Sequence, residues 1–345
     1  MKDASVPKKT AIVIVTFRTP ADLVHCLDAL RKADRAEPFD IFITENAGGG
    51  AYDDTLEALR RGGYVFAPAP EPVGENSFVR LSSCRDEASG VEIHFGQARE
   101  NLGYAGAINI WLRRLMADGK WKGFWILNPD TAPDESALRE LVAYARRHDK
   151  GMVGSRIVFR DNPELIATRG LKWRPLAAKT KGVDKFVSAK FHPDRLDIEA
   201  RIDSPSGASV FITAGCLKKI GLMDEDYFLY FEDLDWGVRA KSACGIGCAE
   251  RSNVPHIGGA SIGSATSRRD RSALSVHLDH RNRLLFVRRR HPRWYPRTVL
   301  IVLARTGEFV AVGAWANFRA ALSGWAAGVL GETGRPDRFF ARRQL

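Results

Sequence analysis

The sequence predicts an α/β protein with a mostly parallel central sheet of the doubly wound kind, flanked by helices. Residues 11–16, AIVIVT, form an unbroken apolar and β-branched run, which is typical of a strand buried on both faces. A helical pattern opens at Thr19 and Pro20, and residues 40–45, DIFITE, form a second strand-like run. A strand, a helix and a strand in such close succession make a βαβ unit, so we expect parallel strands.

The pattern continues along the chain. Gly103 and Gly106 lie in a turn that leads into a helix. Further strands are expected at 123–127, 151–159 and 206–213, and further helices at 98–115, 133–142, 214–221 and 236–242. Residues 66–92 show little periodicity and predict an insertion or an irregular hairpin, whereas the irregular, basic residues 160–205 suggest a segment that covers the substrate.

Composition restricts the class of protein. The 345 residues are 45% hydrophobic and 27% charged, as in ordinary soluble globular proteins, and the formal net charge is +11. The N-terminus leads into the first strand without the apolar stretch of a signal peptide, so we expect a cytoplasmic protein. Residues 299–304 are apolar, but Arg305 and Glu308 follow too soon for a transmembrane helix. Five cysteines without metal-finger spacing predict free thiols: Cys26, Cys84, Cys216, Cys244 and Cys248.

Asp130 follows the expected strand 123–127 through Asn128 and Pro129. A carboxylate at the carboxyl end of a central strand either caps a turn or binds a cation. Mg²⁺ and Mn²⁺ favour oxygen ligands and are often shared between one or two carboxylates and substrate phosphates, which favours the second interpretation. His256, expected in a loop beside two glycines, is on its own a weak candidate ligand.

Residues 224–236, DEDYFLYFEDLDW, bring six carboxylates and five aromatic rings together. The first three acids are typical of a helix start, where carboxylates complement the helix dipole. Glu232 and Asp233 follow an aromatic run that looks buried, and buried acids must be paired, metal-bound or shifted in pKa. We therefore expect a functional role for this second pair.

Residues 281–297 contain seven arginines with Trp294 and Tyr295 between prolines. Such a patch suits an anionic partner, which could be nucleic acid, a phosphorylated substrate or an acidic membrane surface. A solvated helix face is the alternative.

Seven short segments carry a family resemblance by their order along the chain. They are residues 15–18 (VTFR), 45–46 (EN), 101–109 (NLGYAGAIN), 127–130 (LNPD), 206–208 (SGA), 224–235 (DEDYFLYFEDLD) and 256–259 (HIGG). Together they resemble the family 2 glycosyltransferases with the GT-A fold, and among these the bacterial rhamnosyltransferase-like branch that builds cell-surface polysaccharide such as lipopolysaccharide. Arg18 and Glu45 depart from the family's usual Asn and Asp, so the preference for a nucleotide base does not carry over.

The resemblance implies a set of site residues. Asp233 would be the general base, with Glu232 as its neighbour, and Asp130 with His256 would hold a divalent cation, Mg²⁺ or Mn²⁺. The donor would contact Thr16, Phe17, Arg18, Glu45, Asn46, Asn101, Gly103, Tyr104, Gly106, Asn109, Asn128 and Asp130. The acceptor would contact Ser206, Gly207, Ala208, Asp226, Tyr230 and Trp236.

The resulting expectation is an inverting, metal-dependent glycosyltransferase that uses dTDP-rhamnose or a UDP-hexose. Its acceptor would be a glycan, for example one carried on a polyprenyl diphosphate at the inner face of the plasma membrane. We expect a catalytic domain at 1–265, with a nucleotide-sugar half at 1–130 and an acceptor half at 131–265, and a helical region at 266–345 that could lie on an anionic bilayer.

Two other functions would account for part of the sequence. A nucleic-acid-binding protein on a Rossmann-like domain would account for the basic patch and leave the carboxylates unexplained. A nucleotidyltransferase would also use a strand-end Asp, but residues 16–20, TFRTP, are not a Gly-rich phosphate loop.

Overall fold

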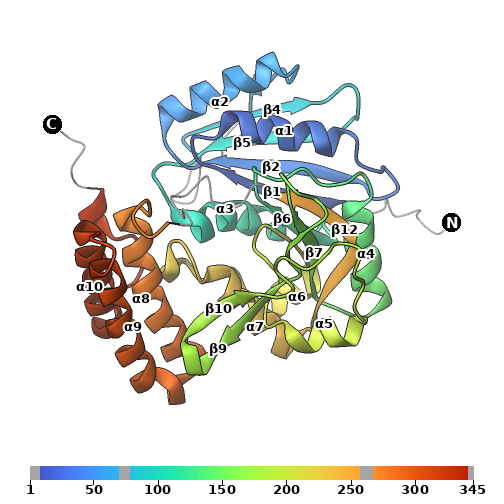
Figure 1. Cartoon of the computed structure of the whole chain (residues 1–345). Helices are drawn as coiled ribbons and strands as arrows, with labels where there is room; N and C mark the ends of the chain where they lie inside the picture. Colours follow the sequence, from blue (N-terminus) through green and yellow to red (C-terminus); the bar gives the residue numbers. More distant parts are fainter. Residues whose placement is uncertain (1–7, 70–77, 257–266, 341–345) are drawn as a thin grey trace.

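The computed structural model describes residues 8–69, 78–256 and 267–340. Its centre is a ten-stranded sheet with the order β12-β7-β11-β6-β1-β2-β5-β4-β3, to which β8 adds by pairing with β7 (Figure 1). The strands are β1 (Thr10–Thr16), β2 (Phe39–Glu45), β3 (Ala67–Pro68), β4 (Arg80–Arg85), β5 (Glu92–Gln97), β6 (Gly123–Leu127), β7 (Met152–Phe159), β8 (Ile166–Thr168), β11 (Ser209–Thr213) and β12 (Ile246–His256). A separate hairpin joins β9 (Leu171–Arg174) and β10 (Lys179–Gly182). The expected α/β fold class is confirmed.

Helices cover both faces of the sheet. They are α1 (Pro20–Arg31), α2 (Gly49–Arg61), α3 (Gly103–Asp118), α4 (Ala137–Arg147), α5 (Arg195–Arg201), α6 (Ala214–Ile220), α7 (Glu232–Ala243), α8 (Ala273–Arg290), α9 (Tyr295–Val310) and α10 (Trp315–Leu330). Within β1, Ile12 and Ile14 pack into a core shared with α1, α2 and α4. The alternate residues Val13 and Val15 pack into a second core with α3, α6 and α7. This alternation explains why every residue of β1 is buried.

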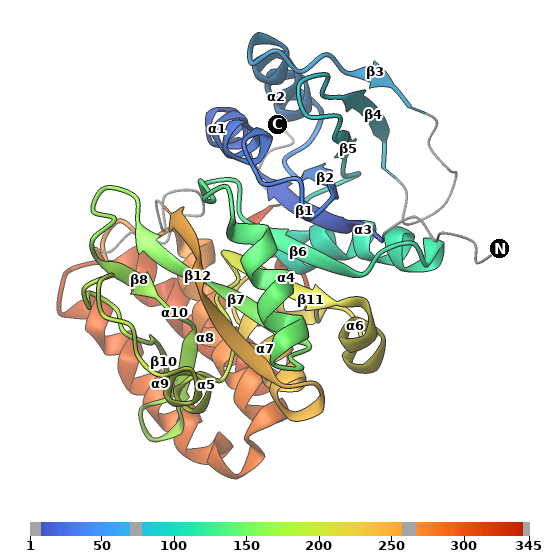
Figure 2. The same cartoon turned by 90° about the vertical axis from the view of Figure 1, so that its right-hand side faces the viewer.

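Helices α8, α9 and α10 form a separate group beside the sheet (Figures 1 and 2). The first of them, α8, is buried along most of its length, from Ser275 to Val287. The other two expose part of their apolar surface. None of the described helices has the length and apolar character needed to cross a membrane.

Three expectations about local structure need correction. Residues 160–205 are not irregular throughout, because they contain β8, β9, β10 and α5. Residues 246–256 form a strand, so His256 ends β12 and does not lie in a loop. Helix α7 starts at Glu232, four residues before the expected start. These elements are short or partly exposed, so their apolar periodicity is weak in the sequence.

Candidate active site

The candidate site lies along one edge of the sheet, where strands distant in the sequence end together. β1 is parallel to β2, with Thr16 opposite Glu45, and parallel to β6, with Ile14 opposite Leu127. β11 runs the other way, so its first residue, Ser209, also lies opposite Leu127. The loops after β1, β2 and β6 and the loop before β11 are therefore neighbours, which is where ligands bind in doubly wound sheets.

Asp130 and His256 meet at this edge. His256 Nε2 lies 3.1 Å from Asp130 Oδ1, and a backbone bridge between Thr131 and His256 holds the two segments together. Asp130 is buried, and His256 Nε2 makes no hydrogen bond to any described residue. A carboxylate oxygen and an imidazole nitrogen are both ligands that Mn²⁺ accepts.

This pair fits a cation that a diphosphate would complete. Mg²⁺ and Mn²⁺ sites of that kind use few protein ligands, and the described residues contain no group of three or more His, Cys, Asp or Glu placed to hold a metal. Asp22, in the first turn of α1, adds negative charge nearby. Burial raises the pKa of Asp22, and the charge of Asp130 raises it further. Asp22 is not among the residues predicted from the sequence, although an acid in the first turn of the helix that follows β1 is placed near this edge.

Glu45 organises the loop after β2. Its side chain is fully buried and accepts hydrogen bonds from the Ala47 N–H at 2.9 Å and from Thr55 Oγ1 at 3.2 Å. Burial raises the pKa of Glu45 to about 7. A direct contact between Glu45 and a nucleotide stays a prediction, and it would require the carboxylate to leave these partners.

Asn46 joins this loop to the start of α3. Its amide nitrogen donates to Asn101 Oδ1 at 3.1 Å and to the Gly103 carbonyl at 3.0 Å, and its amide oxygen accepts from the Leu102 N–H at 2.9 Å. Thr16 is buried at the end of β1, where its carbonyl accepts from the Asn46 N–H at 3.0 Å. The buried residues of the predicted donor set therefore hold together the loops at this edge of the sheet.

Phe17 and Arg18 are exposed beyond this framework. Phe17 is 38% exposed, and the Arg18 guanidinium lies 5.7 Å from the centre of its ring. Arg18 has a φ of +58°, a conformation that is uncommon for a residue with a side chain and that clusters at functional sites. An aromatic ring and a cation at a strand end are able to stack on a base and to contact a phosphate.

Tyr104 of α3 connects the strand-end residues to the acidic segment. Its hydroxyl lies within hydrogen-bond distance of two acceptors, Asn128 Oδ1 at 3.0 Å and the Gly207 carbonyl at 3.2 Å. Burial raises the pKa of Tyr104 well above its usual value, and the charges of Glu232, Asp233 and Asp130 add to the shift. Three of the predicted acids are thus close enough to Tyr104 to act on it electrostatically.

Glu232 and Asp233 occupy the first turn of α7. Glu232 is only 5% exposed, and its Oε2 makes no hydrogen bond to any described residue. Burial and the charge of Asp233 raise the pKa of Glu232 to about 8. Asp233 is partly exposed and accepts hydrogen bonds from the N–H groups of Leu234, at 2.7 Å, and Gly207, at 3.3 Å. Burial raises the pKa of Asp233 as well. An isolated carboxylate pair of this kind suits proton transfer.

The loop before β11 lies directly against Asp233. A Cβ atom on Gly207 would come within 2.9 Å of Asp233 Oδ2, so a side chain there would displace the carboxylate. Ser206 and Ala208 flank this glycine, and Ser206 Oγ lies 3.4 Å from the Ala208 N–H. The structure thus brings this predicted acceptor segment to the predicted base, and its contact with an acceptor stays a prediction.

The aromatic run before Glu232 is strained. Phe228, Tyr230 and Phe231 all have positive φ, between +62° and +76°, which is unusual for bulky residues. The Tyr104 N–H donates to the Phe228 carbonyl at 2.7 Å, and a Cβ atom on Gly103 would lie 2.1 Å from that carbonyl oxygen. Gly103 therefore permits the close approach that fixes this run against α3.

Four residues of the predicted site have roles in packing or pairing within the fold. Asn109 is fully buried and binds the Met223 backbone through both amide atoms, at 2.8 and 3.2 Å. Gly106 lies inside α3, where a Cβ atom would meet Leu102. The Trp236 ring is buried in the core and donates to the Gly221 carbonyl at 3.0 Å, so it is no part of an accessible acceptor surface.

Asp226, the fourth, is bound by Arg289, and this pairing extends to the rest of the acidic segment. Arg289 also binds Asp224, and Arg290 binds the buried Asp235. The interpretation of residues 281–297 as a single anion-binding patch is therefore corrected. The sequence alone does not show that the acids of residues 224–235 face the arginines of residues 281–297, so it does not reveal that these arginines are paired.

Other arginines of this stretch are also engaged within the chain. Arg281 is buried and donates to the carbonyls of Tyr227, at 3.0 Å, and Gly334, at 2.7 Å. Arg293 and Arg297 are exposed. Of the predicted 256–259 segment, residues 257–259 lie outside the described residues.

Comparison with known proteins identifies a family and one related sequence. The model of the glycosyltransferase-like family 2 matches residues 7–295. The low-salt glycan biosynthesis hexosyltransferase Agl10 of Haloferax volcanii is 24% identical over 213 residues, which cover 59% of this chain and 63% of that protein. The alignment thus spans less than two thirds of the relative.

Solved structures agree at the level of the fold. GalNAc-T7 crystallised with UDP, GalNAc and Mn²⁺ has a TM-score of 0.51 and 12% identity, with 80% of this chain and 48% of that chain covered. Residues 1–349 of TarS from S. aureus give a TM-score of 0.48 and 13% identity over 96% of this chain and 82% of that chain. The GalNAc-T7 likeness supports the GT-A fold alone, because the identity is so low.

Proposed function

The chain belongs to the glycosyltransferase-like family 2, and from this premise we propose that it transfers a sugar from a nucleoside diphosphate donor to an acceptor hydroxyl with inversion at the anomeric carbon. The observation that carries the proposal is the placement of Asp233. It is a partly exposed carboxylate beside the buried Glu232, whose Oε2 has no hydrogen-bond partner among the described residues, and Tyr104 connects it to the edge that carries Asp130.

Asp233 would act as the general base. It accepts the proton of the acceptor hydroxyl while that oxygen attacks the anomeric carbon, and the bond from this carbon to the diphosphate oxygen breaks with its electron pair on the leaving group. Because burial raises the pKa of Glu232 to about 8, Glu232 would stay protonated at neutral pH. A neutral Glu232 leaves the negative charge of the pair on Asp233, where the proton is needed.

Asp130 and His256 would hold a divalent cation, which would neutralise the charge that develops on the leaving diphosphate. Phe17 and Arg18 are the exposed members of the donor set, so we assign them to the nucleotide. Asn128, another member of this set, accepts a hydrogen bond from the Tyr104 hydroxyl at 3.0 Å. The donor would be dTDP-rhamnose or a UDP-hexose, and the product part of a cell-surface polysaccharide.

The test is a donor screen. Release of nucleoside diphosphate would be followed for a panel of dTDP- and UDP-sugars, with Mn²⁺ and with a chelator. We expect release from one donor class that depends on the metal and is lost in Asp130→Asn. If the folded protein neither binds nor consumes any sugar nucleotide of the panel, the proposal is wrong.

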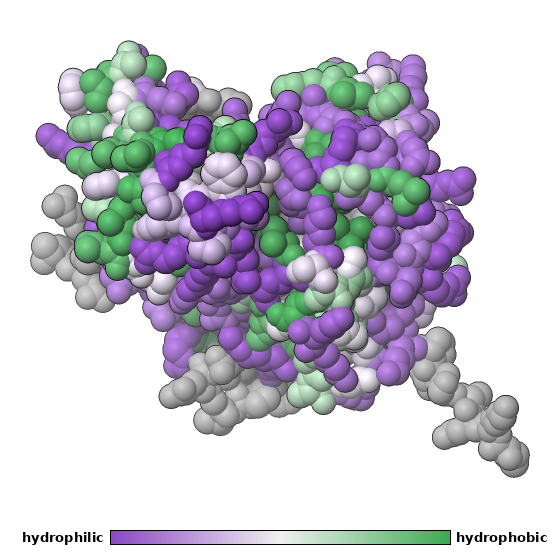
Figure 3. Space-filling view, turned by 90° about the horizontal axis from the view of Figure 1, so that it is seen from below, coloured by the Kyte–Doolittle hydropathy of each residue, from purple (hydrophilic) through white to green (hydrophobic). Residues whose placement is uncertain are grey.

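We also propose that the C-terminal helices dock on an anionic membrane. The exposed side of α9 carries Leu300, 69% exposed, and Leu303, and α10 begins with Trp315, 60% exposed. Hydrophobic side chains gather over this group of helices on the left of Figure 3. The exposed Arg293 and Arg297 at the start of α9 would contact acidic headgroups. The exposed surface of α9 and the start of α10, and not the paired Arg289 and Arg290, is therefore the basis of the membrane proposal.

A further inference from the structure

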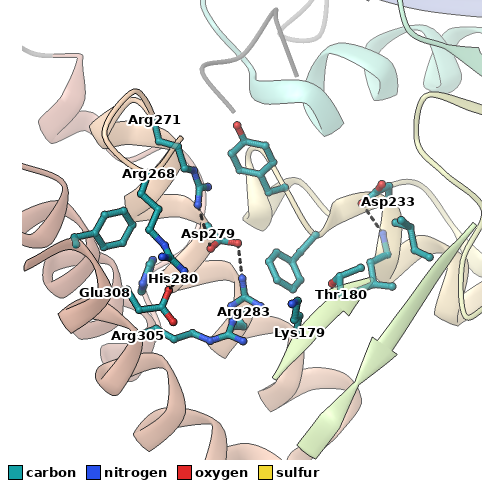
Figure 4. A pocket seen from close by; sticks show the side chains of 15 residues that line it. Lys179, Thr180, Asp233, Arg268, Arg271, Asp279, His280, Arg283, Arg305 and Glu308 are labelled. Carbon is teal, nitrogen blue, oxygen red and sulfur yellow. Dashed lines mark hydrogen bonds and ion pairs between the residues drawn. The ribbon is translucent and has the colours of Figure 1, made fainter. Parts of the chain in front are cut away.

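A cavity of about 490 Å³ separates the catalytic segment from the C-terminal helices. Asp233 and Thr180 line one side, and side chains of α8 and α9 line the other (Figure 4). The volume is in the usual range for small-ligand sites. Because the proposed base is part of its wall, whatever fills this cavity lies next to the reacting hydroxyl.

The wall carries more positive than negative charge. Five of the lining side chains are Lys or Arg, and three are Asp or Glu. Figure 4 shows Arg271 and Arg283 directed toward the same carboxylate, Asp279, at 3.9 and 2.6 Å. One carboxylate thus serves two guanidinium groups, which leaves an excess of positive charge on this side.

The surroundings of Arg305 also carry an excess of positive charge. Burial lowers the pKa of Arg305, and the positive charge of Arg283 lowers it further. Both guanidinium groups donate to the carbonyl of Ala178, at 2.6 Å from Arg283 and 3.2 Å from Arg305. Lys179 is exposed on β10 and lines the same cavity (Figure 4). An anion in this space would offset the mutual repulsion of these cations.

His280 adds a polar group without a partner. The ring is buried, and its Nδ1 lies 2.9 Å from the Val276 carbonyl. That contact requires the proton on Nδ1, so Nε2 is left with a free lone pair, and Nε2 finds no hydrogen-bond partner among the described residues. A bound group that donates, such as a hydroxyl of the acceptor, would supply the missing hydrogen bond to Nε2.

We infer that this cavity seats a phosphate or diphosphate group of the acceptor, held by Lys179, Arg271, Arg283 and Arg305. The inference rests on the proposed glycosyl transfer, since it takes Asp233 as the base at the rim. It narrows the acceptor to anionic glycans, in which a phosphoryl group lies close to the hydroxyl that is glycosylated. Such a group belongs to a lipid-linked diphosphate or to a phosphate on the glycan itself, and the chemistry of recognition is shared.

The inference is tested by calorimetric titration of the full-length protein with inorganic pyrophosphate, a short-chain prenyl diphosphate and a hexose 1-phosphate. A chelator and saturating nucleoside monophosphate keep the probes from the donor site. We compare the wild type with Lys179→Gln and Lys179→Gln/Arg271→Gln. Lys181→Gln is the matched control, because Lys181 lies on the same strand and does not line the cavity.

We expect the double variant to bind the anions at least roughly tenfold more weakly, as when charged hydrogen bonds are lost, and Lys181→Gln to bind as the wild type does. A preference for the prenyl diphosphate would identify a lipid-linked acceptor. Binding of the hexose 1-phosphate as tight as that of the prenyl diphosphate would identify a phosphorylated glycan. Lys179 is exposed, so the single variant tests the site even if the double variant fails to fold.

Failure of the wild type to bind any of the three probes, or wild-type affinity in a folded Lys179→Gln/Arg271→Gln, would overturn the inference. A separate titration with UDP- and dTDP-sugars in Mn²⁺ separates the two proposals. Donor binding without anion binding leaves the transferase standing and removes the phosphate site. Anion binding without donor binding would remove the transferase proposal and would leave the cavity as an anion site that is not tied to glycosyl transfer.

Discussion

Arg290, near the end of α8, forms two hydrogen bonds with the fully buried carboxylate of Asp235, at 2.6 and 3.1 Å. Arg239 and the Tyr227 hydroxyl bind the same carboxylate, at 3.0 and 3.1 Å. The last acid of the acidic segment thus fastens the C-terminal helices to the helix that presents Asp233. The position of the proposed base depends on an ion pair between two segments 55 residues apart.

Loss of this anchor should destabilise the protein. Asp235→Asn keeps the shape of the side chain but leaves two guanidinium groups without a countercharge in a buried site. We expect the free energy of unfolding to fall by about 3 kcal/mol. Asp337→Asn, whose side chain is 85% exposed, should change it by less than about 1 kcal/mol. Urea denaturation measures both, and equal small effects would show that the anchor is unimportant.

Asp233→Asn should abolish transfer and preserve the fold. The amide keeps the size of the side chain and one acceptor oxygen for the Leu234 N–H, loses the longer bond from the Gly207 N–H to the second oxygen, and cannot take a proton. We expect kcat to fall by about 10² to 10⁴, with unchanged donor affinity in a titration. Asp224→Asn, in the same acidic segment, serves as the control. Near-normal turnover of Asp233→Asn would place the base elsewhere.

The raised pKa of Glu232 gives a pH signature. The carboxyl has a pKa of about 8 in the folded protein and an ordinary value of 4.5. Between these values the folded state keeps a proton that the unfolded chain has released, so the free energy of unfolding falls as the pH rises. Glu232→Gln removes this group.

The stability of Glu232→Gln relative to the wild type should therefore increase from about pH 5 to about pH 8, by up to roughly 1.4 kcal/mol per pH unit. Denaturation curves at several pH values in this window measure the difference. A difference that does not vary with pH would mean that the carboxyl titrates normally in the folded protein.

The cation site predicts a loss of Mn²⁺ affinity in the presence of nucleoside diphosphate. Asp130→Asn and His256→Ala each remove one ligand, and we expect Mn²⁺ to bind at least roughly tenfold more weakly, as a change of about 1.4 kcal/mol gives. Paramagnetic resonance of Mn²⁺ reports the free ion directly. Asp118→Asn, an exposed acid at the end of α3, should bind as the wild type does. Equal affinities in all four proteins would exclude this pair as ligands.

Membrane binding should depend on α9 and be independent of the paired arginines. Leu300→Gln/Leu303→Gln removes two exposed apolar side chains, so we expect flotation with anionic liposomes to drop severalfold. Leu196→Gln, 60% exposed on α5, is the matched control. Flotation that is unaffected by the α9 changes, or absent in the wild type, would rule out this surface.

Much of the fold follows from local patterns. The runs at 11–16, 40–45 and 123–127 are strands because they are mostly apolar and often β-branched, and only the centre of a sheet covered on both sides buries every residue of such runs. The placement of Asp130 at a strand end was predictable for the same reason. The strands β8 to β10 and β12 were not, because part of their surface is exposed and tertiary contacts supply their pairing.

The sequence by itself determined the βαβ core, the order of the motifs and the candidate acids, because periodicity and chemical type are local properties. Only the tertiary structure decided which of those acids are paired. Asp224, Asp226 and Asp235 are bound by arginines of α8, whereas Glu232 Oε2 has no partner in the part of the chain that the structure describes and Asp233 stays partly exposed. The physical reason is that a charge is neutralised by what lies near it in space, and α8 returns to the acidic segment only when the chain has folded.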